Sequence, residues 1–271
     1  MEAFFLPVAD GQRFCLLHRP ASSVPIRGAV VHVHPFAEEM NKARRMTSLQ
    51  AKAMAAAGYH VLLVDLHGCG DSSGDFGDAS WSGWVEDVAL ACAWLREQTD
   101  AELWLWGLRT GCLLVAEAVK RLEYANRLLL WQPVLSGKQF LQQFLRMKVA
   151  GEMLTGQSKG LMDRMREDLA QGKSVEIGGY ALSPGLAKGL ELAELSLPET
   201  RLRVEWIEIS GKMDGELSPA AAMRLEKWNS QGHAVRGTAV CGPSFWQTAE
   251  IEECPALIDA SLASMVETNQ P

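Results

Sequence analysis

Leu103-Trp-Leu-Trp-Gly-Leu-Arg109-Thr-Gly111 runs directly into Cys112-Leu-Leu-Val-Ala-Glu-Ala-Val119, and this stretch decides the fold. It predicts a buried apolar strand, a tight turn and an apolar helix. Gly107 and Gly111 stand four apart, as in the G-x-S-x-G frame of a nucleophile elbow, where a strained turn lifts one side chain above a sheet. The lifted position here is Arg109, whose guanidinium is always protonated and has no lone pair with which to attack a carbonyl.

The flanking sequence predicts further strands of the same sheet, alternating with helices. Buried strands are expected at residues 28–34, 60–65 and 127–131, and helical periodicity precedes Gly58 and runs from Trp84 to Leu95. This alternation is typical of an α/β fold with a mostly parallel central sheet and helices on both faces. Ligands of such sheets gather at the carboxyl ends of the strands.

Both ends of the chain add to this sheet. Asp10-Gly11 lies between two apolar runs and predicts a β-hairpin, because glycine supplies the positive φ of a tight turn. Near the C-terminus we expect strands at 202–209 and 234–241, with a helix between them that ends near Gly232. A closing helix is expected from Thr248 to Met265, bent or broken near Pro255.

Between residues 135 and 195 the alternation stops. Apolar stripes at helical spacing are visible and no convincing strand is, which predicts an all-helical insertion over the strand ends. Extra core-packing helices are a compatible interpretation. We therefore divide the chain into a core at 1–134, a helical lid insertion at 135–195 and a second part of the core at 196–271.

Composition narrows the class of protein. The 271 residues are 48% hydrophobic with a net charge of −7, which suits one globular α/β domain. No basic stripe indicates nucleic acid, no run is long enough to span a membrane, and the first residues lack the basic region of a signal peptide. Six cysteines without a C-x-x-C spacing are typical of reduced thiols, so we expect a cytoplasmic protein. We expect no cofactor.

Several motifs, in order along nearly the whole chain, resemble the α/β-hydrolase superfamily. They are the N-terminal hairpin, His34-Pro-Phe36, the loop from Asp65 through Gly68-Cys-Gly-Asp-Ser72, the elbow, and Ser210-Gly-Lys-Met-Asp214. Three stretches more narrowly resemble the family named hydrolase 2, exosortase A system-associated. They are Phe36-Ala-Glu-Glu-Met-Asn-Lys-Ala-Arg-Arg45, Gly107-Leu-Arg-Thr-Gly111 and Gly242-Pro-Ser-Phe-Trp-Gln-Thr248. This resemblance implies a bacterial setting linked to exopolysaccharide export.

The catalytic template of such hydrolases is a serine activated by a histidine that an aspartate orients. Arg109 stands at the nucleophile position, and Asp214 matches the position of the acid. The base should follow the last strand, near Trp246, yet no histidine occurs after His233, which precedes that strand. The absence of both nucleophile and base favours a degenerate triad over a single unusual substitution.

Parts of the hydrolase site are expected to persist. The backbone N–H groups of Phe36 and Thr110 match the donors of an oxyanion hole, although Pro35 stands where the family usually has glycine. Thr110 lacks a visible base. Cys112, at the start of the elbow helix, is more consistent with a buried structural thiol than with a nucleophile.

Two roles for Arg109 remain open from the sequence. It could form an internal ion pair with Asp214, Glu38 or Glu39, or it could receive an anionic ligand at the pocket floor.

Other side chains are expected near the same pocket. His34 and Trp246 are expected to line it, while the spacing of His32 and His34 is too weak a signal to predict a metal site. Trp81 and Trp84 are candidates to stack on a ligand, whereas Trp104 and Trp106 are expected in the core.

Two functions from different classes follow. The residues favour a non-catalytic protein that binds a small molecule, with an anion among the candidates, and acts as an accessory in exopolysaccharide systems. The alternative, which the family name implies, is an active acyl hydrolase, an esterase or thioesterase, with an unrecognised nucleophile. No particular protein partner is indicated.

Overall fold

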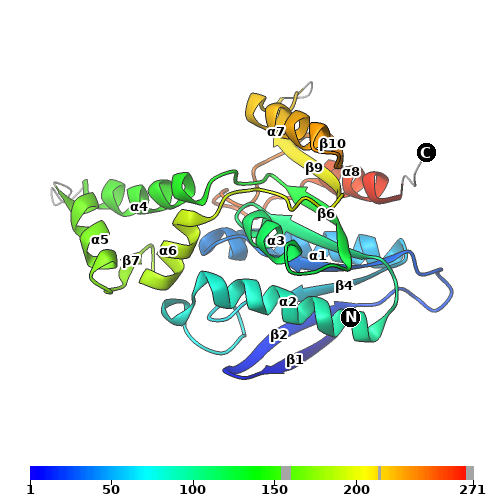
Figure 1. Cartoon of the computed structure of the whole chain (residues 1–271), viewed down its shortest axis with the longest axis horizontal. Helices are drawn as coiled ribbons and strands as arrows, with labels where there is room; N and C mark the ends of the chain where they lie inside the picture. The colour runs from blue at the N-terminus through cyan, green and yellow to red at the C-terminus, as the bar shows by residue number, and fades with distance from the viewer. Residues whose placement is uncertain (154–159, 213–214, 267–271) are drawn as a thin grey trace.

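A mixed eight-stranded sheet forms the centre of the protein (Figure 1). The computed structural model describes residues 1–153, 160–212 and 215–266. The sheet order is β1-β2-β4-β3-β5-β6-β9-β10, antiparallel at β1–β2 and β2–β4 and parallel at every other pairing. Its strands are β1 (Glu2–Val8), β2 (Gly11–His18), β3 (Gly28–Val33), β4 (Tyr59–Val64), β5 (Leu103–Leu108), β6 (Ala125–Trp131), β9 (Arg203–Ser210) and β10 (Ala234–Cys241). The predicted mostly parallel central sheet is confirmed.

Helices cover both faces of the sheet and create two apolar cores. One core packs α2 (Trp81–Gln98), α3 (Gly111–Val119) and α7 (Pro219–Ser230) against the sheet, and the other packs α1 (Glu38–Ala56) and α8 (Pro255–Val266). Strand β5 contributes side chains to both cores, because successive side chains of a strand point to opposite faces of the sheet. Leu103 and Leu105 enter the first core, whereas Trp104 and Trp106 enter the second, as expected for core tryptophans.

The predicted N-terminal hairpin is confirmed. Val8 pairs with Gly11, and Gly11 has a φ of 128°, a value that side chains with a Cβ rarely adopt. At the other end, the closing helix begins only at Pro255, so the expectation that it starts at Thr248 is wrong. Proline suits the first turn of a helix, where its missing N–H costs no hydrogen bond.

The inserted segment is not all helical. It contains α4 (Gly137–Met153), α5 (Leu161–Ala170) and α6 (Pro184–Leu192), but also a hairpin of β7 (Val175–Ile177) and β8 (Tyr180–Leu182). Gly178 and Gly179 form its turn, both with positive φ, and three-residue strands are too short to show a period of two. The expectation of no strand in this segment is therefore wrong. Figure 1 shows the segment extending beyond one end of the sheet.

Where the structure describes the chain, no helix is both long and apolar enough to cross a membrane.

Candidate functional site

The turn between β5 and α3 has the geometry of a nucleophile elbow. Arg109 has a φ of 55°, in the left-handed region that a residue with a Cβ occupies only at a cost. A Cβ on Gly107 would lie 2.8 Å from the Cα of Cys112, and one on Gly111 would collide with the carbonyl of Val33. The two glycines are therefore required by the close approach of β5, α3 and β3, as the sequence predicted.

The side chain of Arg109 lies between a carboxylate and an indole ring. Its Nε and Nη2 each lie 3.3 Å from Oε1 of Glu39, and its Cζ lies 5.4 Å from the centre of the Trp246 ring. Glu39 comes from the first turn of α1, and Trp246 from the loop after β10. Of the two expected partners that the structure describes, Glu38 and Glu39, it is Glu39 that pairs with Arg109.

Burial and pairing have opposite effects on the pKa of Glu39. Its side chain is 19% exposed, and burial raises the pKa of the carboxyl above its ordinary value of 4.5, whereas the Arg109 guanidinium acts to lower it. The distances of 3.3 to 3.4 Å are long for a charge-assisted hydrogen bond. Within the described residues Nη1 of Arg109 has no hydrogen-bond partner, so one edge of the guanidinium remains available.

A cavity of about 440 Å³ opens at this pair. Five of the predicted site residues line it together, namely Phe36, Glu38, Glu39, Arg109 and Trp246. Its other lining residues are Ala37, Lys42, Phe140, Gln143, Phe144, Met147, Ile177, Gly178, Tyr180 and Gln247. We call this cavity the elbow pocket. Its volume lies in the range of small-molecule sites, and most of its surroundings are aromatic or apolar.

His34 lines a different cavity of about 220 Å³, together with His32 and Asp65. Nε2 of His34 accepts a hydrogen bond from the Leu66 amide, so Nδ1 carries the proton and donates to the carbonyl of Pro35. Burial lowers the pKa of His34, and lowers that of His32 to about 3. Both imidazoles are therefore neutral, and His34 faces away from the elbow pocket in which we expected it.

The expected oxyanion donors are two backbone N–H groups without an acceptor among the described residues. Neither the Phe36 nor the Thr110 backbone N–H donates a hydrogen bond to another described residue. The Phe36 ring instead anchors the inserted segment, with its centre 5.7 Å from that of Phe140 and 5.1 Å from that of Phe144.

The alternative nucleophiles are buried. Cys112 is fully buried, its pKa is raised by desolvation, and its thiol contacts the carbonyl of Trp131, as a structural cysteine does. Thr110 is 2% exposed, and its hydroxyl does not cap the helix that follows.

Trp246 occupies the region where the hydrolase template places its base. It is 4% exposed, and its ring contacts the Arg109 guanidinium in place of a serine–histidine hydrogen bond. Trp81 and Trp84 are also buried, in the core beneath α2, and do not line the elbow pocket. Asp214, the expected acid, lies outside the described residues.

The inserted segment supplies residues that the sequence did not point to. The Tyr180 hydroxyl donates to Oε2 of Glu38 at 3.0 Å and accepts from the Asn41 amide, also at 3.0 Å. These bonds tie the β7–β8 hairpin to the start of α1 across the pocket mouth. The Gly178-Gly179 turn was the available signal, because Gly-Gly between apolar residues is a hairpin signature.

Among residues 1–153, 160–212 and 215–266, no group of three or more His, Cys, Asp or Glu side chains is placed to hold a metal ion.

Fold and elbow together define an α/β hydrolase. The model of one hydrolase family, described as serine aminopeptidase, S33, matches residues 24–169, more than half of the 271 residues. The chain belongs to this family.

Solved structures agree in fold. Est1E from Butyrivibrio proteoclasticus superposes with a TM-score of 0.65 at 14% identity, covering 97% of each chain. A carboxyl esterase from Bacillus coagulans gives 0.59 at 15% identity, covering 89% of this chain and 90% of its own. A serine hydrolase without lid from Xanthomonas campestris gives 0.58 at 16%, covering 97% of this chain and 92% of its own. Among curated proteins, no sequence matches this chain.

Proposed function

We propose that this protein is a non-catalytic member of the family that binds a small anionic molecule in the elbow pocket. The observation that carries the proposal is Arg109 at the nucleophile position. A residue that cannot attack a carbonyl is held there in a strained backbone conformation, and its guanidinium faces a ligand-sized cavity.

The pocket chemistry supports an anion with an apolar or aromatic body. One edge of the Arg109 guanidinium is open, and the unused amides of Phe36 and Thr110 are further donors on the same loops. The rings of Phe140, Phe144 and Trp246 supply apolar surface around that charge. Ferulic acid, an aromatic carboxylic acid, binds to Est1E, which has the same fold.

We further propose that residues 135–195 act as a lid over this pocket. The hydrogen bond of Tyr180 to Glu38 and the contacts of Phe140 and Phe144 with Phe36 support this role, because they join the segment to the core at the pocket mouth.

The cellular setting is proposed on sequence grounds. The resemblance of Phe36–Arg45, Gly107–Gly111 and Gly242–Thr248 to the exosortase A system-associated family supports an accessory role in exopolysaccharide export. All six cysteines are free thiols, which supports a cytoplasmic location.

The alternative is an acyl hydrolase with an unrecognised nucleophile. The family match favours it, since the family is described by a serine peptidase activity. The buried Cys112 and Thr110 count against it.

The deciding experiment is intact mass after incubation with a fluorophosphonate and, separately, with an activated acyl ester. We expect no stoichiometric adduct on protein shown to be folded. An adduct would establish the hydrolase alternative, and peptide mapping would identify the nucleophile. In parallel, naphthalene-2-sulfonate is expected to bind in a saturable manner, whereas the uncharged naphthalene-2-sulfonamide binds weakly. Equal affinity for the two would remove the anion-receptor proposal.

A further inference from the structure

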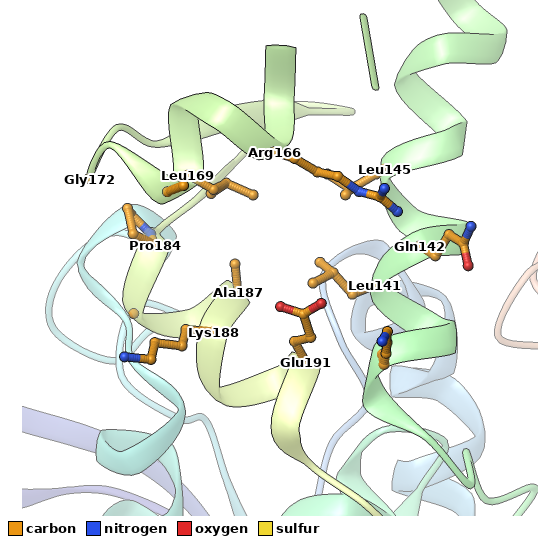
Figure 2. A pocket seen from close by; sticks show the side chains of 13 residues that line it. Leu141, Gln142, Leu145, Arg166, Leu169, Gly172, Pro184, Ala187, Lys188 and Glu191 are labelled. Carbon is orange, nitrogen blue, oxygen red and sulfur yellow. The ribbon is translucent and has the colours of Figure 1, made fainter. Parts of the chain in front are cut away.

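A second cavity, larger than the elbow pocket, lies wholly inside the inserted segment. It has a volume of about 620 Å³, lies between α4, α5 and α6 and is open to solvent on one side (Figure 2). Leu141, Leu145, Leu169 and Ala187 give it an apolar floor. It shares no lining residue with the elbow pocket, so it is a separate site.

Helix α4 is the wall between the two cavities. Leu141 and Leu145 face the second cavity, whereas Phe140 and Phe144 face the elbow pocket. Each pair is spaced by four residues and therefore forms one face of the helix. The two adjacent faces of α4 thus serve different cavities.

The second cavity carries a local surplus of positive charge. Lys138, Arg166 and Lys188 line it, against the single carboxylate of Glu191, in a chain whose net charge is −7. None of these four side chains forms an ion pair or a hydrogen bond with another described residue. Figure 2 shows Arg166 reaching from α5 toward α4 across the cavity, with Glu191 rising from α6 below Leu141.

We propose that this cavity binds a single-chain amphiphilic anion. Its aliphatic chain would cover the leucine floor, where burial of apolar area drives binding. Its phosphate or carboxylate head would meet Arg166, which reaches across the cavity toward α4 (Figure 2), because a cation that pairs with no described residue attracts an anion without first breaking an internal pair. A cavity of this volume is within the range that holds small molecules.

The binding test uses the full chain and dodecyl phosphate, kept below its micelle concentration. Isothermal titration calorimetry is run on wild-type protein and on Arg109→Met, which removes the cation of the elbow pocket. Saturable binding is expected in both, with none for dodecyltrimethylammonium or for inorganic phosphate at the same concentrations. Loss of binding in Arg109→Met would place the probe in the elbow pocket and overturn the proposal, as would equal binding of the cationic amphiphile.

Charge variants locate the probe. Arg166→Gln is expected to weaken dodecyl phosphate binding about fivefold, the effect typical of a solvent-accessible charge pair, and Glu191→Gln to strengthen it about threefold. Lys173→Gln is the matched control, because Lys173 lies just beyond the cavity, pairs with Asp168 and should leave affinity unchanged. Effects of the same sign in Arg166→Gln and Glu191→Gln, or none in either, would contradict the assignment.

Filling the cavity tests the apolar floor. Ala187 is buried and faces the cavity from α6, so Ala187→Leu is expected to abolish binding. Thermal unfolding of the same variant shows whether the helices remain packed. A folded Ala187→Leu protein that binds like wild type would overturn the proposal, and so would binding to phosphatidylglycerol vesicles without binding to monomeric dodecyl phosphate.

Discussion

Arg13–Asp87 and Arg109–Glu39 are both pairs of an arginine and a carboxylate, yet they differ in closeness and in burial. Nε of Arg13 lies 2.7 Å from Oδ1 of Asp87, and the two side chains are 4% and 2% exposed. The contact of Arg109 with Glu39 is 3.3 Å long, and both side chains are 19% exposed.

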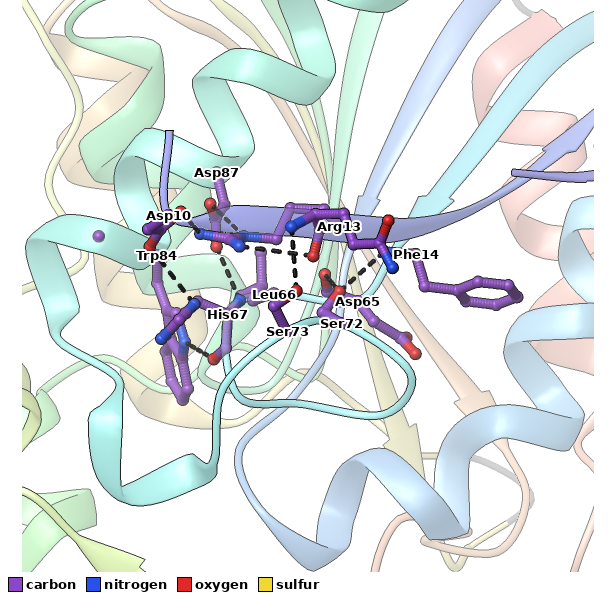
Figure 3. A network of polar contacts seen from close by, with 12 residues as sticks. Asp10, Arg13, Phe14, Asp65, Leu66, His67, Ser72, Ser73, Trp84 and Asp87 are labelled. Carbon is purple, nitrogen blue, oxygen red and sulfur yellow. Dashed lines mark hydrogen bonds and ion pairs between the residues drawn. The ribbon is translucent and has the colours of Figure 1, made fainter. Parts of the chain in front are cut away.

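The partners around the two pairs differ as well. Arg13 also contacts Asp10 at 2.7 Å. Asp87 accepts a hydrogen bond from the backbone N–H of His67, and the backbone carbonyl of His67 accepts one from the indole N–H of Trp84 (Figure 3). This network joins β2, the loop after β4 and α2. It gives both Arg13 and Asp87 further hydrogen-bond partners besides each other. The Arg109 pair leaves an edge of its guanidinium open to a cavity. The difference teaches that the first pair is closed within the fold, whereas the second leaves a donor edge toward a cavity, as the proposed anion site requires.

The largest expected effect is the loss of the closed pair. Arg13→Met should lower the free energy of unfolding by about 3 kcal/mol, because Asp87 is left buried without its cation. Urea unfolding measures the change. Arg19→Met is the control, since Arg19 meets Glu2 only at 3.6 Å on the surface and should leave stability unchanged. Similar effects of the two substitutions would erase the contrast between a closed and an exposed pair.

The open pair should matter for binding rather than for folding. Arg109→Met is expected to lower the affinity for naphthalene-2-sulfonate at least about tenfold, the worth of a charge-assisted hydrogen bond, while urea unfolding changes little. Calorimetry on wild-type and variant protein provides the measurement. A variant that binds the sulfonate normally but unfolds in much less urea would show that Arg109 is structural like Arg13.

Glu39 gives the open pair a pH dependence. Its pKa is raised by burial, so the protonated form persists above the ordinary value of 4.5. A neutral Glu39 releases Arg109 to the ligand, and affinity for the sulfonate, whose own charge is constant, should fall as pH rises through that raised pKa. The stability associated with the protonated form is lost over the same rise in pH.

The matching variant is Glu39→Gln, which should bind the sulfonate roughly tenfold more tightly than wild type at neutral pH. Its affinity should vary less with pH, although Glu38, Lys42 and Tyr180 also face the pocket. An unchanged pH profile in Glu39→Gln would assign the dependence to one of those groups.

The smallest expected effect concerns the backbone. Because Arg109 has a φ of 55°, Arg109→Gly should be more stable than Arg109→Ala by about 1 kcal/mol, the usual cost of a left-handed residue with a Cβ. Urea unfolding of the two variants isolates this term, since neither has a long side chain. Equal stability would mean that the turn relaxes when the guanidinium is absent.

Local signals sufficed for much of the fold. The strand, turn and helix around Gly107 and Gly111 depend on neighbours in sequence, as does the Asp10-Gly11 hairpin, and both were predicted correctly. The β7–β8 hairpin was missed because strands of three residues carry too little periodicity. The last helix begins at Pro255 and not at Thr248, because proline costs no hydrogen bond in the first turn of a helix.

The sequence predicts which loops form the site, but not in which direction each side chain points. The sheet topology places the elbow, the segment after β3 and the loop after β10 at the same edge of the sheet. It thereby brings Arg109, Glu39 and Trp246 together. Which carboxylate pairs with Arg109, and that His34 turns to the Leu66 amide, depend on side-chain packing between distant elements. No periodicity in one sequence encodes such contacts.

The shared wall formed by α4 makes the two cavities thermodynamically linked whenever a ligand in one of them shifts that helix. Linkage is reciprocal, so an amphiphile that changes the affinity for the sulfonate by some factor must have its own affinity changed by the same factor. Binding in one cavity would then change the affinity of the other through α4, without any contact between the two ligands.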